Sequence, residues 1–269
     1  MEEIVHIIPL GHEFDRVVKP FEKLKANRAY LLSILRIKGI PYITDEMSEK
    51  QQYFLERVKK ALEEKGIEVV VKHTNIFDIL ETMKNVSGII RREKERDNLV
   101  YVNISGAGRL TSVAAALAAM AHGAKPYYVI ADRYSKTEEE ELQHGLSICE
   151  EPKIMYIMNF KISLPDEISL HILAKLCKQG KGMKTDEIID FLRKELKLEE
   201  FGESKLVRKH DERSIKQILL NKLNRKFLDK MEYAGYIERE RVGKRNTIRI
   251  TETGRYIAHI SGLLDIEQQ

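Results

Sequence analysis

The segment 100–112 constrains the fold of this chain more than any other stretch. A β-branched run, Val100 to Ile104, breaks abruptly into Ser105-Gly106-Ala107-Gly108, and an alanine-rich segment follows. This order predicts a strand, a glycine turn and the start of a helix. Such a turn presents free backbone N–H groups and the positive end of a helix dipole, which suits a phosphate. An ordinary βα turn would also need glycine for its backbone angles.

Strand-like and helical segments alternate as far as Met158. We expect strands at Ile4–Leu10, Ala29–Leu35, Ile67–Val71, Asn98–Ile104, Pro126–Ala131 and Ile154–Met158. Apolar residues at helical spacing predict long helices over 49–65 and 76–95. The alternation requires crossover connections, so it predicts an α/β domain with a Rossmann-like, mostly parallel sheet. In such sheets ligands bind beyond the carboxyl ends of the strands.

The pattern changes after Met158. Three helical segments are followed by two strand-like ones, Tyr236–Arg241 and Thr247–Thr251, which a Gly-Lys-Arg tip joins. This layout resembles an α+β winged helix-turn-helix, and Phe227–Glu238 resembles the end of its recognition helix. We therefore expect residues 1–160 to form a ligand-sensing domain and residues 161–269 a winged helix-turn-helix DNA-binding domain.

Basic residues are concentrated in the C-terminal third. The net charge is +4, yet residues 205–249 hold fourteen Lys or Arg against six Asp or Glu. Such a concentration is typical of nucleic-acid binding, although solvated helix faces also produce runs of lysine. The expected contacts to double-stranded DNA are the long donors of the recognition helix and the wing: Lys216, Gln217, Asn221, Lys222, Arg225, Lys226, Lys244, Arg245 and Asn246.

The glycine turn permits a dinucleotide interpretation. Gly106-Ala107-Gly108 could begin a Rossmann fingerprint, with Asp132 at a suitable distance for a ribose. However, Thr111 occupies the place of the third glycine, and four strands precede the turn where one is usual. A winged-helix repressor that senses NAD(H) is therefore the weaker alternative.

A second interpretation comes from a family resemblance. The segment Asn103–Arg109 resembles the Asn-x-(Ser/Thr)-Gly-Gly-x-(Lys/Arg) signature of CARF domains, the CRISPR-associated Rossmann fold, with Ala107 in place of the second glycine. The segment His6–Arg16 resembles the opening of archaeal regulators that join a CARF domain to a winged helix. The resemblance implies a homodimer through the N-terminal domain, with a symmetric pocket for a cyclic oligoadenylate, cyclic tetra-adenylate being favoured. It also implies transcription regulation in CRISPR or antiviral defence.

The expected ligand-binding residues follow three of the predicted strands. They are Leu10, Gly11, His12, Ser33, Arg36, Asn103, Ser105, Gly106, Ala107, Gly108, Arg109 and Thr111. No residue stands out as a dedicated general base, so we assign no catalytic residue and expect sensing rather than chemistry. A ring nuclease that slowly cleaves the ligand without metal is the other alternative, because the same donors would stabilise the developing charge.

No other cofactor or partner is expected. The two cysteines, Cys149 and Cys177, are isolated and lack metal-ligand spacing, which predicts buried thiols and no metal site. No apolar run reaches membrane-spanning length, and the N-terminus lacks signal-peptide features, so we expect a cytoplasmic protein. The ring size, the operator and the direction of regulation stay open.

Overall fold

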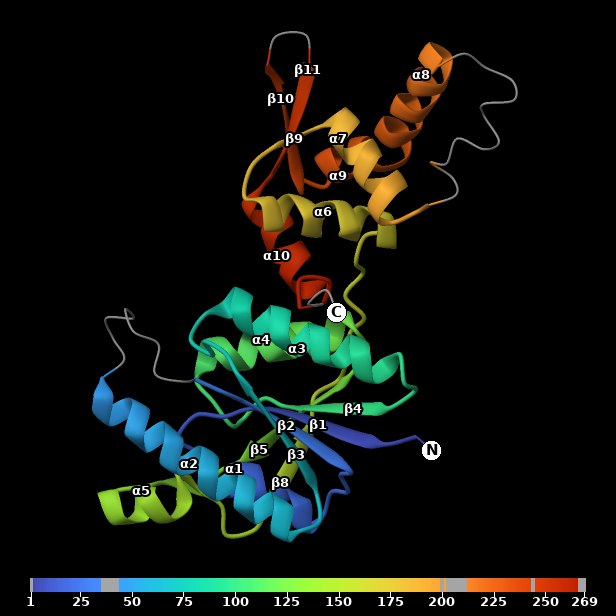
Figure 1. Cartoon of the computed structure of the whole chain (residues 1–269). Coiled ribbons are helices and arrows are strands. Elements are labelled where there is room, and N and C mark those ends of the chain that lie inside the picture. Colours follow the sequence, from blue (N-terminus) through green and yellow to red (C-terminus); the bar gives the residue numbers. More distant parts are fainter. Residues whose placement is uncertain (1, 35–43, 199–200, 202–211, 243–244, 266–269) are drawn as a thin grey trace. The chain divides into compact units, whose positions relative to one another are not determined.

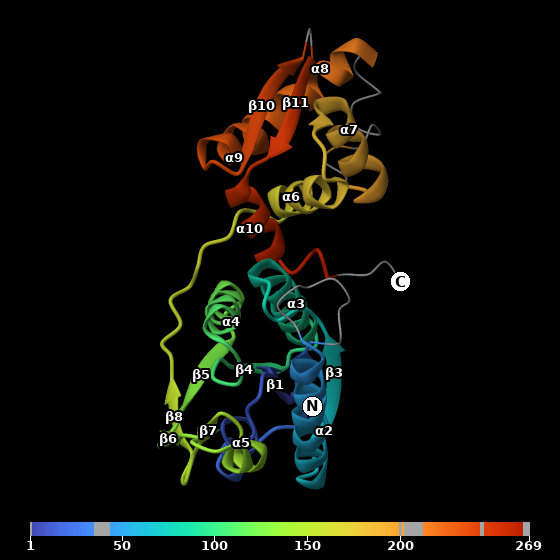
Figure 2. The same cartoon turned by 90° about the vertical axis from the view of Figure 1, so that its left-hand side faces the viewer.

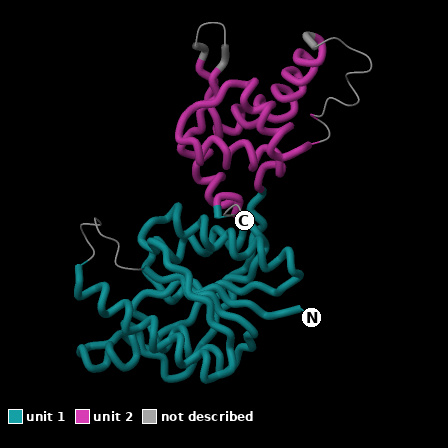
Figure 3. Tube along the Cα trace, in the orientation of Figure 1, with its two compact units in different colours: residues 1–163, 265–269 teal, residues 164–264 magenta. Residues whose placement is uncertain are grey.

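The computed structural model of the chain describes residues 2–34, 44–198, 201, 212–242 and 245–265. Figures 1 and 2 show the chain from two sides, and Figure 3 shows its two compact units. One unit is Met1–Ser163 with Asp265–Gln269, and the other is Leu164–Leu264. Among the described helices, none is long and apolar enough to cross a membrane.

The first unit is built on a six-stranded sheet with the order β3-β2-β1-β4-β5-β8 (Figure 1). Five strands are parallel, and β8 runs antiparallel to β5 at one edge. The strands are β1 (Ile4–Pro9), β2 (Arg28–Ser33), β3 (Glu68–His73), β4 (Leu99–Asn103), β5 (Lys125–Ile130) and β8 (Lys153–Tyr156). The Rossmann-like, mostly parallel sheet that the sequence predicts is therefore confirmed.

Helices cover both faces of this sheet (Figures 1 and 2). They are α1 (Asp15–Val18) with the 3₁₀ turn η1 (Lys19–Glu22), α2 (Asp45–Glu64), α3 (Ile79–Lys94) and α4 (Arg109–Ala121). Neighbouring side chains of β1 pack against helices on opposite faces of the sheet, since successive residues of a strand point to opposite faces. Ile7 packs in the cluster with α3 and α4, while Ile8 packs in the cluster with α1 and α2.

A small substructure that the sequence patterns did not predict lies between β5 and β8. It consists of β6 (Arg133–Tyr134), α5 (Glu138–His144) and β7 (Ser147–Ile148), with β6 and β7 paired antiparallel. Two-residue strands carry no periodic pattern, and α5 has no buried residue that would mark an apolar face. Its position is fixed instead by contacts distant in sequence, such as the bond from the Ser147 hydroxyl to the buried Glu13 carboxylate.

The second unit is a winged helix, as the sequence predicts. Its elements are α6 (Glu167–Gln179), β9 (Met183–Lys184), α7 (Thr185–Asp190) with the π-helical turn η2 (Phe191–Glu195), α8 (Glu212–Leu223), the π-helical turn η4 (Asn224–Leu228), α9 (Asp229–Tyr233), β10 (Ile237–Val242), β11 (Arg245–Ile250) and α10 (Glu252–Ile260). The strands form a sheet of order β10-β11-β9. Leu219, Leu223 and Phe227 bury one face of the α8–η4–α9 run against α6 and α7.

Candidate functional site

The glycine turn lies where two neighbouring parallel strands end. The turn follows β4, and the amide of Gly11, just after β1, donates to the carbonyl oxygen of Gly106 over 2.7 Å. A Cβ atom at Gly106 would lie 2.7 Å from the carbonyl oxygen of Pro9 and 3.1 Å from the Val17 side chain. Only glycine fits there. Because β1 leads to β2 and β4 leads to β5 on its other side, this is a topological switch point of the sheet.

Asn103 and Ser105 stabilise the turn through buried hydrogen bonds. The Asn103 side-chain amide donates to the carbonyl oxygen of Arg16 over 3.0 Å, and its Oδ1 accepts from the Ser105 amide and hydroxyl. The Ser105 hydroxyl oxygen in turn accepts from the Val129 amide over 3.1 Å. Both side chains are buried. Their hydrogen bonds go to other parts of the protein, so these side chains hold the turn in position.

The open part of the turn is at Gly108 and Arg109. Gly108 is the N-cap of α4, and no side chain of the described residues caps this helix end. A Cβ atom at Gly108 would meet no described atom within 4 Å. The Arg109 side chain is exposed and has no hydrogen bond or ion pair to the described residues. Uncapped N–H groups, a helix dipole and a free guanidinium therefore meet at one point, an arrangement that binds anions.

Three other predicted ligand contacts are buried and bonded to the protein itself. Leu10 and Ser33 are both fully buried, and the Gln51 side-chain amide joins them by donating to the Leu10 carbonyl and the Ser33 hydroxyl. Thr111 is also buried and donates to the carbonyl oxygen of Ile76 over 2.6 Å. Sequence reasoning missed Gln51, although it shares the apolar face of α2 with Phe54 and so is a polar residue at a core position.

His12 lies half-buried beside the end of β1. Its ring stacks on Phe54 with centroids 5.7 Å apart. Burial lowers the pKa of His12, and the nearby charge of Lys50 lowers it further. Both effects favour the neutral form of the imidazole. A Cβ atom at Gly11 would lie 3.5 Å from the Cα atom of Ala107, an ordinary van der Waals distance. Arg36 lies outside the described residues.

An exposed apolar pair beside the turn was not anticipated. Leu110 is 64% exposed and Val113 is 50% exposed, both in the first turns of α4. Other residues of α4, such as Ala115 and Ala118, are fully buried in the cluster shared with α3. The sequence signal was present, because a helix with apolar residues on all sides has more than one face to cover.

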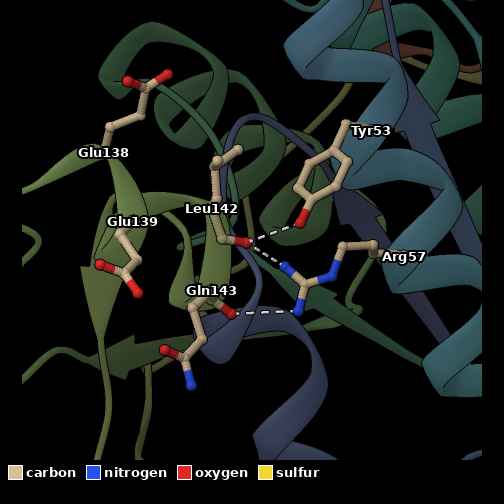
Figure 4. A pocket seen from close by; sticks show the side chains of 6 residues that line it. All are labelled: Tyr53, Arg57, Glu138, Glu139, Leu142 and Gln143. Carbon is tan, nitrogen blue, oxygen red and sulfur yellow. Dashed lines mark hydrogen bonds between the residues drawn. The ribbon is translucent and has the colours of Figure 1, made fainter.

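A hollow of about 500 Å³ lies away from these residues, between α2 and α5 (Figure 4). The Arg57 guanidinium donates to the carbonyl oxygens of Leu142 and Gln143, and the Tyr53 hydroxyl donates to that of Leu142. Of the predicted ligand-binding residues that the structure describes, none lines this hollow. Among the described residues, no group of three or more His, Cys, Asp or Glu is arranged to hold a metal ion.

The predicted DNA contacts have different environments in the winged-helix unit. Lys216 pairs with Asp186 at 2.9 Å, Gln217 donates to Asn221, and the Lys222 ammonium lies 5.2 Å from the centroid of the Phe201 ring.

Arg225 and Lys226 are exposed on η4. Arg245 and Asn246 pair with Val242 and Arg241 across the wing, and Lys244 lies outside the described residues. Tyr233, 96% exposed at the end of α9, was not among the expected contacts.

Both units match known domain models. Residues 4–134 match the HFX_2341-like N-terminal domain family, and residues 168–262 match the DUF6293 C-terminal winged helix domain. The uncharacterized protein MJ1513 of Methanocaldococcus jannaschii is 27% identical over 150 residues, which are 52% of this chain and 42% of that protein. The match therefore spans less than half of the relative.

Several solved structures resemble the chain with low sequence identity. Can2 from Sulfobacillus thermosulfidooxidans in complex with cyclic tetra-adenylate aligns with a TM-score of 0.40 and 12% identity, over 97% of this chain and 62% of that one. Enterococcus italicus Csm6 bound to cyclic hexa-2'-fluoro-hexa-dAMP aligns with a TM-score of 0.41 and 13% identity, over 87% of this chain and 59% of that one. The chain thus consists of a Rossmann-like domain with a mostly parallel sheet, followed by a winged-helix domain.

Proposed function

We propose that this protein is a homodimeric, DNA-binding transcription regulator that senses a cyclic oligoadenylate. The observation that carries the proposal is the exposed Arg109 beside the uncapped N-terminus of α4, on a chain that continues into a winged helix. The first feature suits a polyphosphate and the second suits duplex DNA. A ligand-controlled transcription regulator needs both a ligand site and a DNA-binding surface.

The symmetry of the ligand supports a paired site. A cyclic tetra-adenylate carries four phosphates around a ring that can adopt twofold symmetry, so two identical turns can bind it equivalently. Each protomer would supply the backbone around Gly108, the guanidinium of Arg109 and the neutral ring of His12. The bidentate fork of an arginine matches a phosphate in geometry and charge.

Leu110 and Val113 support the same assembly. An apolar pair that is half exposed or more, next to the open turn, is costly to leave in water. Burying it against the same pair of a second chain would bring two copies of Arg109 to one twofold axis.

The winged-helix unit supports the DNA-binding half of the proposal. Leu219, Leu223 and Phe227 bury one face of the recognition run, which leaves Arg225 and Lys226 on its exposed side. Long cationic side chains on such a helix reach phosphates and base edges. Ligand and DNA affinities are then linked, because each partner changes the affinity of the dimer for the other.

Ring cleavage is a second candidate function, favoured by the neutral imidazole of His12. A neutral histidine can accept a proton from an attacking ribose hydroxyl. Chromatography of cyclic tetra-adenylate incubated with the protein separates the two functions, since a pure sensor returns the ligand intact.

Calorimetric titration of the protein with cyclic tetra-adenylate and cyclic hexa-adenylate tests the proposal. We expect Arg109→Ala to weaken binding at least tenfold, because a charge-assisted hydrogen bond is worth about 1.5–3 kcal/mol. The matched control is Arg133→Ala, which removes an arginine of the same unit that is paired with Glu140. Absence of binding by the unsubstituted protein would contradict the proposal, and stabilisation by NADH instead would favour the redox alternative.

A further inference from the structure

The Asp265 side chain is held in the N-terminal unit by two ion pairs. Its carboxylate is 8% exposed and accepts from two cations, Lys72 over 2.5 Å and Arg92 over 2.8 Å. Lys72 lies on β3 and Arg92 on α3. Each carboxylate oxygen therefore has its own charged donor, a strong arrangement for a side chain held near the surface.

A glycine makes room for Asp265. Gly88 lies in the interior of α3, where glycine is less favourable than alanine. A Cβ atom at Gly88 would collide with the Cβ atom of Asp265 and lie 2.5 Å from its Oδ2. An unfavourable helix residue and a paired carboxylate thus coincide at one point.

The position of Asp265 in the chain gives this contact its significance. The chain leaves the N-terminal unit after Ser163, forms the winged-helix unit, and returns to the N-terminal unit at Asp265. Asp265 directly follows Leu264, the last residue of the winged-helix unit. Asp265 is therefore the residue at which the chain, on leaving the winged-helix unit, enters the N-terminal unit again.

A packed route leads from the proposed ligand site to Asp265. Arg109 begins α4, and Ala115 and Ala118 of α4 share a buried cluster with Ile89 of α3. Ile89 is adjacent to Gly88 in the same helix. A shift of α4 on ligand binding would therefore press on the helix that holds Asp265.

We propose that Asp265 is a clasp through which the N-terminal unit transmits its ligand state to the winged-helix unit. The anchoring half of this proposal needs only the contacts above. The transmitting half rests on the proposed function.

Hydrogen–deuterium exchange of the full chain tests the anchor without any ligand. Asp265→Asn removes the charge, and Gly88→Ala places a methyl group where Asp265 sits while favouring the helix. We expect both variants to speed amide exchange in residues 261–265 at least tenfold. The control Lys84→Ala, which removes an ion pair with Glu81 on the same helix, leaves that exchange unchanged. Unchanged exchange in both Asp265→Asn and Gly88→Ala would overturn the anchor.

The ratio of DNA dissociation constants with and without cyclic tetra-adenylate tests transmission. We expect both clasp variants to bring this ratio to within twofold of one while ligand affinity is retained. A ratio equal to that of the unsubstituted protein would overturn the transmitting role. If the unsubstituted protein itself shows no ligand effect, the proposed function and the transmitting role fail together, and the exchange experiment still decides the anchor.

Discussion

The amide of Gly11 donates to the carbonyl oxygen of Gly106 over 2.7 Å, and this bond joins the end of β1 to the glycine turn that follows β4. The turn is therefore fixed by a neighbouring strand as well as by its own sequence. Its rigidity matters to function, because a preorganised anion site loses less entropy when it binds.

Alanine substitution at the two glycines of the turn is expected to change the free energy of unfolding by different amounts. Gly106→Ala forces a Cβ atom to within 2.7 Å of the Pro9 carbonyl oxygen, and we expect it to lower the free energy of unfolding by about 1–3 kcal/mol. Gly108→Ala meets no described atom at a φ of −63°, and we expect the free energy of unfolding to change by less than about 0.5 kcal/mol, because the reduced freedom of the unfolded chain offsets the weaker N-cap preference of alanine. Chemical denaturation measures both. Equal effects would show that the Pro9 carbonyl does not explain the need for glycine.

Glu13 predicts a pH-dependent component of stability. Burial raises the pKa of Glu13 to about 7, although Ser147 and Arg16 favour its carboxylate form. The folded protein therefore keeps a proton that the unfolded chain has lost between about pH 4.5 and 7, and Glu13 lowers the free energy of unfolding as pH rises through this window. The full effect is on the order of 3 kcal/mol.

A difference measurement isolates this effect from His6, whose pKa burial lowers to about 4. The contribution of His6 has the opposite sign, because its stability is lost as pH falls from about 6.5 to 4. We expect the free energy of unfolding of Glu13→Gln, minus that of the unsubstituted protein, to rise between pH 4.5 and 7. A difference that stays constant across this range would contradict the assignment.

The exposed pair on α4 predicts the oligomeric state. Leu110→Glu combined with Val113→Glu places charge on the proposed dimer face, and we expect analytical ultracentrifugation to show a shift from dimer to monomer. Leu142→Glu, at an exposed leucine of α5, serves as the control and is expected to stay dimeric. A dimer that survives the double substitution would place the interface elsewhere.

The recognition run predicts a salt-dependent DNA affinity. Arg225→Ala with Lys226→Ala removes two exposed cations, and we expect weaker binding together with a smaller slope of log Kd against log salt. The slope should fall by about 0.9 for each phosphate that the variant no longer neutralises. Lys60→Ala, at an exposed lysine of the first unit, is the control. If the double variant and the control bind DNA equally well, η4 is not on the DNA-binding face.

Local patterns were sufficient for the six strands of the main sheet, the long helices and the winged helix, but not for β6, α5 and β7. Apolar alternation marked the strands, helical spacing marked α2 and α3, and the Gly-Lys-Arg tip marked the wing, because each of these signals lies within one element. The glycine turn was located correctly for the same reason.

The roles of single residues were harder to predict. Asn103 and Ser105 have the chemistry of ligand contacts, yet their partners are Arg16 and Val129, which lie 87 and 24 residues away in the sequence. Asp265 and Gly88 give no local signal at all, since each explains the other only once the chain is folded. Burial and long-range packing decide such roles, and a linear pattern contains neither.

Fluorescence anisotropy of a labelled DNA duplex, with and without cyclic tetra-adenylate, decides whether this protein couples ligand binding to DNA binding. At a ligand concentration near the Kd of the unsubstituted protein for the ligand, we expect the Kd for DNA to change at least fivefold in the unsubstituted protein and much less in Arg109→Ala. A Kd that is indifferent to the ligand in the unsubstituted protein, or an equal response in Arg109→Ala, would contradict the proposed function.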